Sequence, residues 1–168
     1  MKELTVKQLS REGFLHLGTY ADMINPEGPH LGKEPCCFYR DMALLPLGQS
    51  TSAGFSITRV SPRPFVIDEL EYHTNTGEVI LPLDGDILVQ AAPASGNGIL
   101  PAEDISVFFV PKGTLVMLRP GVWHAGPFAA GDSPVNILVA LPERTYANDC
   151  TVIKLKPEEC RSFSFSCK

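Results

Sequence analysis

The sequence lacks long hydrophobic runs, dense basic clusters and any helix pattern long enough to connect parallel strands. No apolar run approaches the length of about 18 residues that a helix needs to span a bilayer. The first residues lack the apolar core of a signal peptide. These absences exclude a membrane-spanning helix, and they lead us to expect a cytoplasmic protein.

Basic residues are also too few and too dispersed for a nucleic-acid surface. The chain has 14 Lys and Arg against 19 Asp and Glu, and its net charge is -5. No stretch of Lys or Arg is dense enough to bind a phosphate backbone. A small anionic substrate remains compatible with this balance, because a single local Arg can act against the overall charge.

The five cysteines are an odd number, and they show no spacing typical of a zinc site. Cys36 and Cys37 are adjacent, and Cys160 and Cys167 have no partner pair. We therefore expect free thiols in a reducing compartment.

Fifteen prolines and fourteen glycines in 168 residues favour many turns and short strands over long helices. Short segments rich in Val, Ile, Leu or Phe predict strands at 37–45, 53–60, 66–73, 78–83, 86–91, 105–110, 115–118, 122–128, 135–141 and 151–155. One short helix is expected from Ser10, which can cap it, to Gly18, which can end it in a left-handed conformation. Residues 157–160 are expected to form a last helical turn.

Strands without crossover helices predict an antiparallel sandwich, barrel or jelly roll. The chain is long enough for one domain with a substantial core and short for two, so a single domain over residues 1–168 is expected.

The segment from Glu71 to Gly85 carries three possible metal ligands. One residue separates Glu71 from His73, so on a strand the two side chains point to the same face. Glu78 follows, at the start of an apolar segment, and His124 supplies a fourth candidate about forty residues later. Carboxylate and imidazole suit divalent ions of borderline hardness.

This segment resembles the first motif of the cupin superfamily, which runs His-x-His, three or four residues, Glu, six residues, Gly. Glu71 stands where the first His would be, His73 takes the second, Glu78 follows after four residues and Gly85 after six more. The sequence Asp84-Gly85-Asp86 then predicts a tight hairpin turn between two apolar strands.

The second cupin motif ends Pro-x-Gly, two residues, His, three residues, Asn. Here Pro120-Gly121 is contracted, His124 falls in place after Gly121, and Phe128 replaces the Asn. The resemblance to both motifs therefore implies a cupin-type double-stranded β-helix, a jelly-roll barrel, preceded by the short helix.

Within that superfamily the chain resembles the ureidoglycolate lyases. The residues that carry this resemblance are Ser56–Arg59, Ile67–His73, Ile80–Gly85, Val122–His124 and Asn148–Cys150, together with the N-terminal segment Leu9–Phe14. Glu78 departs from the pattern, because close members usually carry Gln there. The loop at 92–104 and the tail after Pro157 are not clearly family-like.

The resemblance implies a cytoplasmic homodimer with a divalent ion that acts in allantoin degradation. Its reaction would be that of a carbon–nitrogen lyase, which splits ureidoglycolate into glyoxylate and urea. The ion is expected to be Ni, Mn or Zn, because N and O ligands do not discriminate strongly among them.

The hypothesis assigns Glu71, His73 and His124 as metal ligands, with Glu78 as either the fourth ligand or the general base. Arg59 is expected to clamp the carboxylate of the substrate with its planar guanidinium. The alternatives are purely structural roles: the histidines would be core residues satisfied by hydrogen bonds, and Arg59 would pair with a nearby carboxylate.

Two further predictions concern residues near these. Trp123 is expected to be core packing. Turn formation explains Asn148 and Asp149 without chemistry. Two functional alternatives stay open: another metal-dependent cupin enzyme, such as a sugar isomerase or an oxygenase, and a non-catalytic cupin that binds a small carboxylate.

Overall fold

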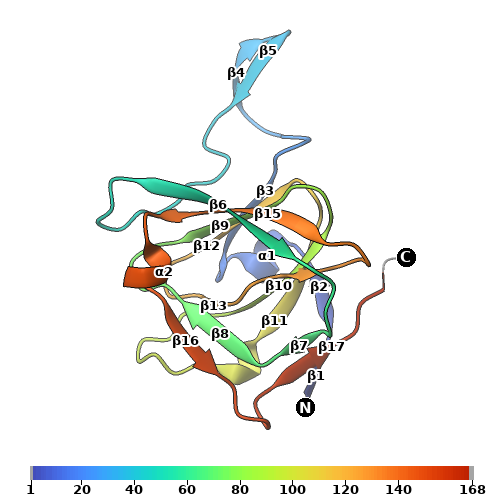
Figure 1. The fold of residues 1–168 in the computed structure, drawn as a ribbon. Helices are drawn as coiled ribbons and strands as arrows, with labels where there is room; N and C mark the ends of the chain where they lie inside the picture. The colour runs from blue at the N-terminus through green and yellow to red at the C-terminus, as the bar shows by residue number, and fades with distance from the viewer. Residues whose placement is uncertain (1, 167–168) are drawn as a thin grey trace.

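The structure, a computed structural model, describes residues 2–166, and strands dominate it (Figure 1). The strands are β1 (Lys2–Leu4), β2 (Val6–Gln8), β3 (Gly18–Asp22), β4 (His30–Lys33), β5 (Cys36–Tyr39), β6 (Ala53–Val60), β7 (Val66–Ile67), β8 (Glu69–Tyr72), β9 (Glu78–Pro82), β10 (Ile87–Ala92), β11 (Ser106–Val110), β12 (Thr114–Leu118), β13 (Trp123–His124), β14 (Phe128–Ala129), β15 (Val135–Pro142), β16 (Thr151–Lys154) and β17 (Arg161–Phe163). Helical structure is limited to α1 (Arg11–Phe14), α2 (Thr145–Asn148) and a 3-10 turn at Ala102–Asp104. None of these is a helix long and apolar enough to cross a membrane.

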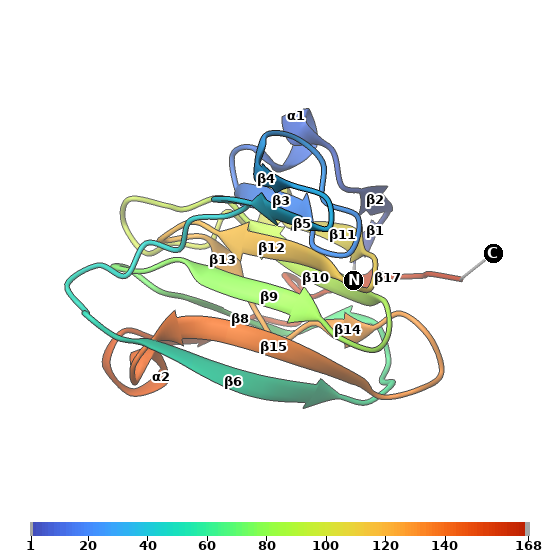
Figure 2. The ribbon, with the colours of Figure 1, turned by 90° about the horizontal axis from the view of Figure 1, so that it is seen from above.

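Two sheets enclose the core of the barrel (Figure 2). One sheet has the strand order β3-β12-β9-β15-β6. The other has the order β16-β8-β13-β10-β11-β2, with β14 paired to β10. Most pairs are antiparallel, but β2 runs parallel to β11 and β1 runs parallel to β17. The expected all-β fold with a short N-terminal helix is thus confirmed.

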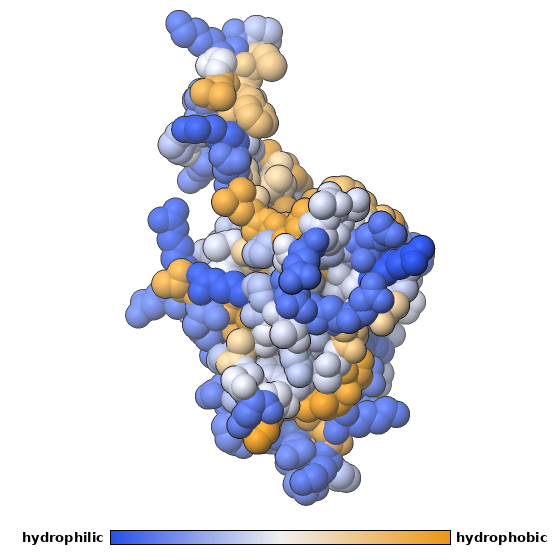
Figure 3. Space-filling model, turned by 90° about the vertical axis from the view of Figure 1, so that its left-hand side faces the viewer, coloured by the Kyte–Doolittle hydropathy of each residue, from blue (hydrophilic) through white to orange (hydrophobic). Residues whose placement is uncertain are grey.

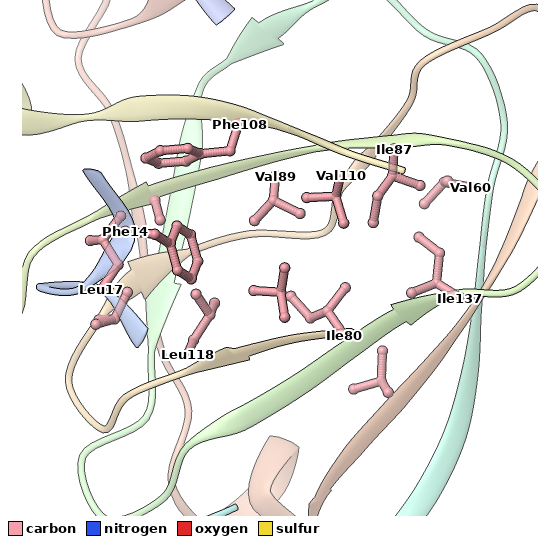
Figure 4. Packing of buried hydrophobic residues seen from close by; sticks show 14 of the residues in the cluster. Phe14, Leu17, Val60, Ile80, Ile87, Val89, Phe108, Val110, Leu118 and Ile137 are labelled. Carbon is pink, nitrogen blue, oxygen red and sulfur yellow. The ribbon is translucent and has the colours of Figure 1, made fainter. Parts of the chain in front are cut away.

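The interior of the barrel is a continuous apolar cluster to which both sheets contribute (Figure 4). Ile80 and Ile137 come from one sheet, and Ile87 and Val89 come from the other. Strand β10 is buried on both faces, so its alternate residue Leu88 packs outside the barrel with Trp123 and the short β7 and β17 segments. Trp123 is therefore a core residue, as expected.

The helix is shorter than the sequence predicts. Ser10 caps it by accepting a hydrogen bond from the Gly13 amide at 3.1 Å, as expected, but helical structure ends at Phe14. Gly18 does not end the helix and instead begins β3, opposite Leu118. A Cβ at Gly18 would lie 1.9 Å from the Met117 carbonyl oxygen, so the glycine serves close strand approach.

The expected strand at 37–45 is largely wrong. Residues 30–39 instead form the hairpin β4–β5, which projects from the barrel, and residues 40–52 form no strand (Figures 1 and 3). The hairpin pairs Leu31 with Phe38, and both side chains are exposed. Residues 157–160 form a hydrogen-bonded turn without a helix.

The turn at Asp84-Gly85-Asp86 is also not a hairpin turn. Strands β9 and β10, which it joins, lie in different sheets, so the turn carries the chain around a corner of the barrel. Asp84 accepts a hydrogen bond from the Asn136 amide at 2.7 Å, and Asp86 accepts one from the Lys112 amide at 2.8 Å. Side-chain contacts to β15 and to the turn between β11 and β12 therefore fix this corner.

Candidate metal centre

Strand pairing brings together four predicted residues that are distant along the chain. His124 on β13 lies opposite Glu71 on β8 and opposite Ala91 on β10. Glu78 begins β9, on the same face as Ile80, which belongs to the interior cluster. His73 follows directly after β8. Because side chains alternate along a strand, Glu71 and Glu78 face the inside of the barrel.

The donor atoms of these residues converge at one point. One ligand atom each from Glu71, His73 and His124 lies within 4.8 Å of the other two. The Glu78 Oε2 lies 3.1 Å from the His73 Nε2 and 2.9 Å from the His124 Nε2. Both imidazoles are almost fully buried, with 4% and 3% of their surface exposed. The cluster is therefore interior, and it is not a solvated surface group.

Backbone carbonyls fix the orientation of both imidazoles. The His73 Nδ1 lies 2.7 Å from the Asp149 carbonyl oxygen, and the His124 Nδ1 lies 2.9 Å from the Val122 carbonyl oxygen. A carbonyl oxygen only accepts, so each Nδ1 must carry the proton and donate. In the neutral rings this leaves the Nε2 lone pairs facing Glu78, which is the tautomer that a metal ligand needs.

The donor set fits a divalent ion. Ligand atoms at about 2.1 Å from one ion and at right angles to each other are about 3 Å apart. The distances from Glu78 Oε2 to the two Nε2 atoms are of this size. Two imidazoles and two carboxylates also match the ligand types of Mn, Ni, Zn and Fe. Glu71, His73 and His124 are therefore residues that could hold such an ion, and Glu78 contacts both imidazoles.

Without an ion, protons must compensate the buried carboxylate. Burial by itself raises the pKa of Glu78, but His124 and His73 outweigh it and lower that pKa to about 2. Burial likewise lowers the pKa of His124, but the Glu78 carboxylate outweighs it and raises that pKa to about 9. In the metal-free protein a proton on His124 thus occupies the role that a cation would take.

Two neighbours of the centre were missed by the sequence reasoning, which explained Asn148 and Asp149 by turn formation alone. The Cys150 thiol donates to Glu71 Oε2 at 3.1 Å. Burial, followed by the hydrogen bond to Glu71, raises the pKa of this thiol to about 12, so it stays protonated. The Asp149 carboxylate accepts from the amides of Thr74 at 2.8 Å and Asn75 at 2.7 Å. No local motif predicts these contacts, because they join segments more than 70 residues apart.

Arg59 is not brought to this cluster. It lies on β6, one residue before Val60, which points into the core, so Arg59 points outward and is exposed. Its Nη1 donates to the Asn136 side chain at 3.0 Å. The expected clamp on a substrate carboxylate is therefore not supported within this chain. The sequence placed Arg59 on the correct strand, but the alternation of that strand turns it away.

Among the described residues Cys36, Cys37, Cys150 and Cys160 are free, as expected, whereas Cys167 lies outside the described part of the chain.

The structure thus defines an all-β barrel with histidines and carboxylates gathered between two facing sheets. Comparison of the whole sequence with known protein families identifies the family of this chain. A model of the ureidoglycolate lyase family matches residues 1–160, and the chain belongs to that family. A ureidoglycolate lyase of Rhodobacter capsulatus is 26% identical over 126 residues, which cover 74% of this chain and 77% of the relative.

Solved structures give a weaker likeness. An oxalate decarboxylase of Bacillus subtilis, in a study of its Mn(II) centres, is 18% identical, with a TM-score of 0.43 over 61% of this chain. A single-residue variant of the same enzyme has a TM-score of 0.44. The chain spans about a quarter of the length of these decarboxylases, 24%. This likeness is too limited to bear on the chemistry of the chain.

Proposed function

We propose that this protein is a metal-dependent ureidoglycolate lyase that breaks a C–N bond to release glyoxylate and urea. Family membership supports the lyase and its substrate. The observation that carries the metal dependence is that one donor atom each from Glu71, His73 and His124 lies within 4.8 Å of the other two, with the Glu78 carboxylate in contact with both imidazoles. The other cupin activities have no comparable support.

The reaction requires two proton movements. Ureidoglycolate carries a hydroxyl, a carboxylate and a ureido nitrogen on one carbon. When the hydroxyl loses its proton, the C–O bond becomes the carbonyl of glyoxylate, the C–N bond breaks, and the urea nitrogen gains a proton. A bound divalent ion would supply Lewis acidity that lowers the pKa of the hydroxyl.

The residues of this chain hold and orient the reacting groups. His73 and His124 present Nε2 because carbonyls fix Nδ1, and Glu71 presents a carboxylate from the adjacent strand. We assign Glu78 as the fourth ligand, because its Oε2 touches both Nε2 atoms. A general base would instead be expected to face the substrate.

The variant Glu78→Gln separates the two roles. An amide oxygen can still bind an ion, so at saturating metal a ligand role predicts that kcat falls by about tenfold or less. Loss of a general base lowers kcat by about 10²–10⁴-fold. A loss of that larger size would return Glu78 to the role of base.

The direct test measures glyoxylate and urea release from racemic ureidoglycolate, with the protein stripped by chelator and then resupplied with Mn²⁺, Ni²⁺ or Zn²⁺. We expect release far above the spontaneous rate only with metal. His124→Ala should abolish it, whereas His30→Ala on the exposed hairpin should not. Release at the spontaneous rate under all conditions would rule out the lyase, and binding of glyoxylate without turnover would favour a sensor.

Homodimerisation, a cytoplasmic location and a place in allantoin degradation belong to the same proposal. Exposed apolar side chains on the edge strand β6, Phe55 at 73% and Ile57 at 57%, favour a surface covered by another chain. Light scattering of the purified protein tests the dimer, and a monomeric mass at micromolar concentration would refute it.

A further inference from the structure

One short segment contacts two of the proposed ligands from outside the cluster. Asp149 and Cys150 lie between α2 and β16, and β16 pairs with β8, the strand that carries Glu71. The register places Thr151 opposite Tyr72, so the two residues before Thr151 lie beside the end of β8, where His73 follows. The segment is thus held against the ligand-bearing strand by the sheet itself.

Asp149 fixes three consecutive residues after β8. Its carbonyl oxygen accepts from the His73 ring at 2.7 Å. Its carboxylate accepts from the Thr74 amide with Oδ1 and from the Asn75 amide with Oδ2. These amides lie in the connection between β8, which carries Glu71, and β9, which carries Glu78. A carboxylate that accepts two amides forms strong charge-assisted bonds, so it holds this connection in one conformation.

Cys150 forms a hydrogen bond with Glu71, the proposed ligand on β8. Its Sγ lies 3.1 Å from Glu71 Oε2, and the thiol is the donor because a carboxylate only accepts. Engaging one oxygen of Glu71 limits rotation of the carboxylate. Glu71 is half-buried, so without this bond its side chain would have room to turn toward solvent.

We propose that Asp149 and Cys150 are positioning residues of the metal centre, Cys150 by orienting the Glu71 carboxylate and Asp149 by fixing His73 and the chain after it. This inference rests on the proposed metal dependence. Neighbours that hydrogen-bond to metal ligands change metal affinity by about 10–100-fold when they are removed. A thiol is a weak donor, so Cys150 belongs at the low end of that range.

The test uses Mn²⁺ as the probe. The six-line EPR signal of free Mn²⁺ gives the dissociation constant, and the spectrum of bound Mn²⁺ reports ligand arrangement. We expect Cys150→Ala to raise the dissociation constant about tenfold and to alter the bound spectrum. Cys150→Ser, which keeps a donor, should remain close to wild type, and Asp149→Ala should weaken binding by about 10–100-fold.

Cys160→Ala is the matched control, because Cys160 is a half-buried thiol that packs in the outer apolar cluster. It should leave Mn²⁺ affinity unchanged. Thermal unfolding of each metal-free variant separates weakened folding from a changed centre. A variant whose affinity falls while its metal-free melting temperature stays near wild type supports positioning.

Two results would overturn this inference while leaving the proposed metal dependence intact. In the first, wild type binds Mn²⁺, and Cys150→Ala and Asp149→Ala bind it with the same dissociation constant. In the second, Cys150→Ala and Cys150→Ser weaken Mn²⁺ binding equally. The second result would mean that the thiol contributes bulk and not a hydrogen bond. A wild-type protein that binds no Mn²⁺, Ni²⁺ or Zn²⁺ would overturn the proposed metal dependence, and this inference with it.

Discussion

Replacing Glu78 with Gln in the metal-free protein should remove a pH dependence of stability that the Glu78–His124 pair creates. The two groups are buried, and they meet at 2.9 Å. Glu78 raises the pKa of His124 from its ordinary 6.5 to about 9. The charged pair therefore favours the folded state over the unfolded chain, where the pair does not exist.

The sign follows from the two pKa directions. His124 has a raised pKa, so its contribution is fully present below pH 6.5 and is lost as the pH rises to about 9. Glu78 has a lowered pKa, so its contribution is present above its ordinary value of 4.5 and is lost as the pH falls toward about 2. Both shifts describe one interaction, and its energy is counted once.

The magnitude comes from the His124 shift. At about 1.4 kcal/mol per pKa unit, the rise from 6.5 to about 9 corresponds to about 3 kcal/mol. For a chain of this size that is a change in melting temperature of about 6–12 °C.

The assay is urea unfolding with a chelator present, at pH 6 and at pH 9.5, for wild type and Glu78→Gln. The difference in unfolding free energy between the two proteins should be about 3 kcal/mol larger at pH 6 than at pH 9.5. Gln has nearly the volume of Glu, so packing is matched. Parallel pH profiles of the two proteins would refute the reasoning.

Three shorter predictions accompany it. With saturating Mn²⁺ the pH dependence of wild-type stability should reverse: stability should rise from pH 6 to pH 8, because fewer protons compete with the ion for His124 at the higher pH. Thermal scans that show no rise would contradict this. Arg59→Ala should leave KM for ureidoglycolate within about twofold, because its side chain points out of the barrel; a tenfold rise in KM would restore the clamp. Gly18→Ala should cost about 2 kcal/mol or more in urea unfolding, because its Cβ would meet the Met117 carbonyl, whereas Gly96→Ala, with open space around it, should cost little.

The strands that the sequence predicts best are those with a clear apolar pattern and turn residues at both ends. Strand β6 matches the predicted 53–60, and β15 and β11 differ from their predicted ranges by a residue or so. The segment 37–45 was assigned wrongly because its apolar residues, among them Phe38, lie on a hairpin that does not pack on the barrel. Strands β1, β2 and β17 were missed because they are only three residues long, and sheet pairing at the ends of the chain creates them.

For the centre, the spacing of Glu71, His73, Glu78 and His124 in the cupin motifs was sufficient to name them as candidate ligands, and the structure places them beside one another. Strand alternation puts every second side chain on one face of a strand, but it does not say which face is inward. The same rule applied to Arg59 depends on which face of β6 is inward, and only the packing of Val60 into the core reveals that.

The sequence by itself determined the β architecture and the family, and it named four candidate side chains for the centre, because those follow from local pattern and motif spacing. Tertiary structure alone decided which way Arg59 points and that Asp84–Asp86 turns a corner between sheets. It also decided that Asp149 and Cys150 form hydrogen bonds with His73 and Glu71. The physical reason is that these contacts join segments whose proximity depends on sheet order and register, and no local sequence pattern encodes either one.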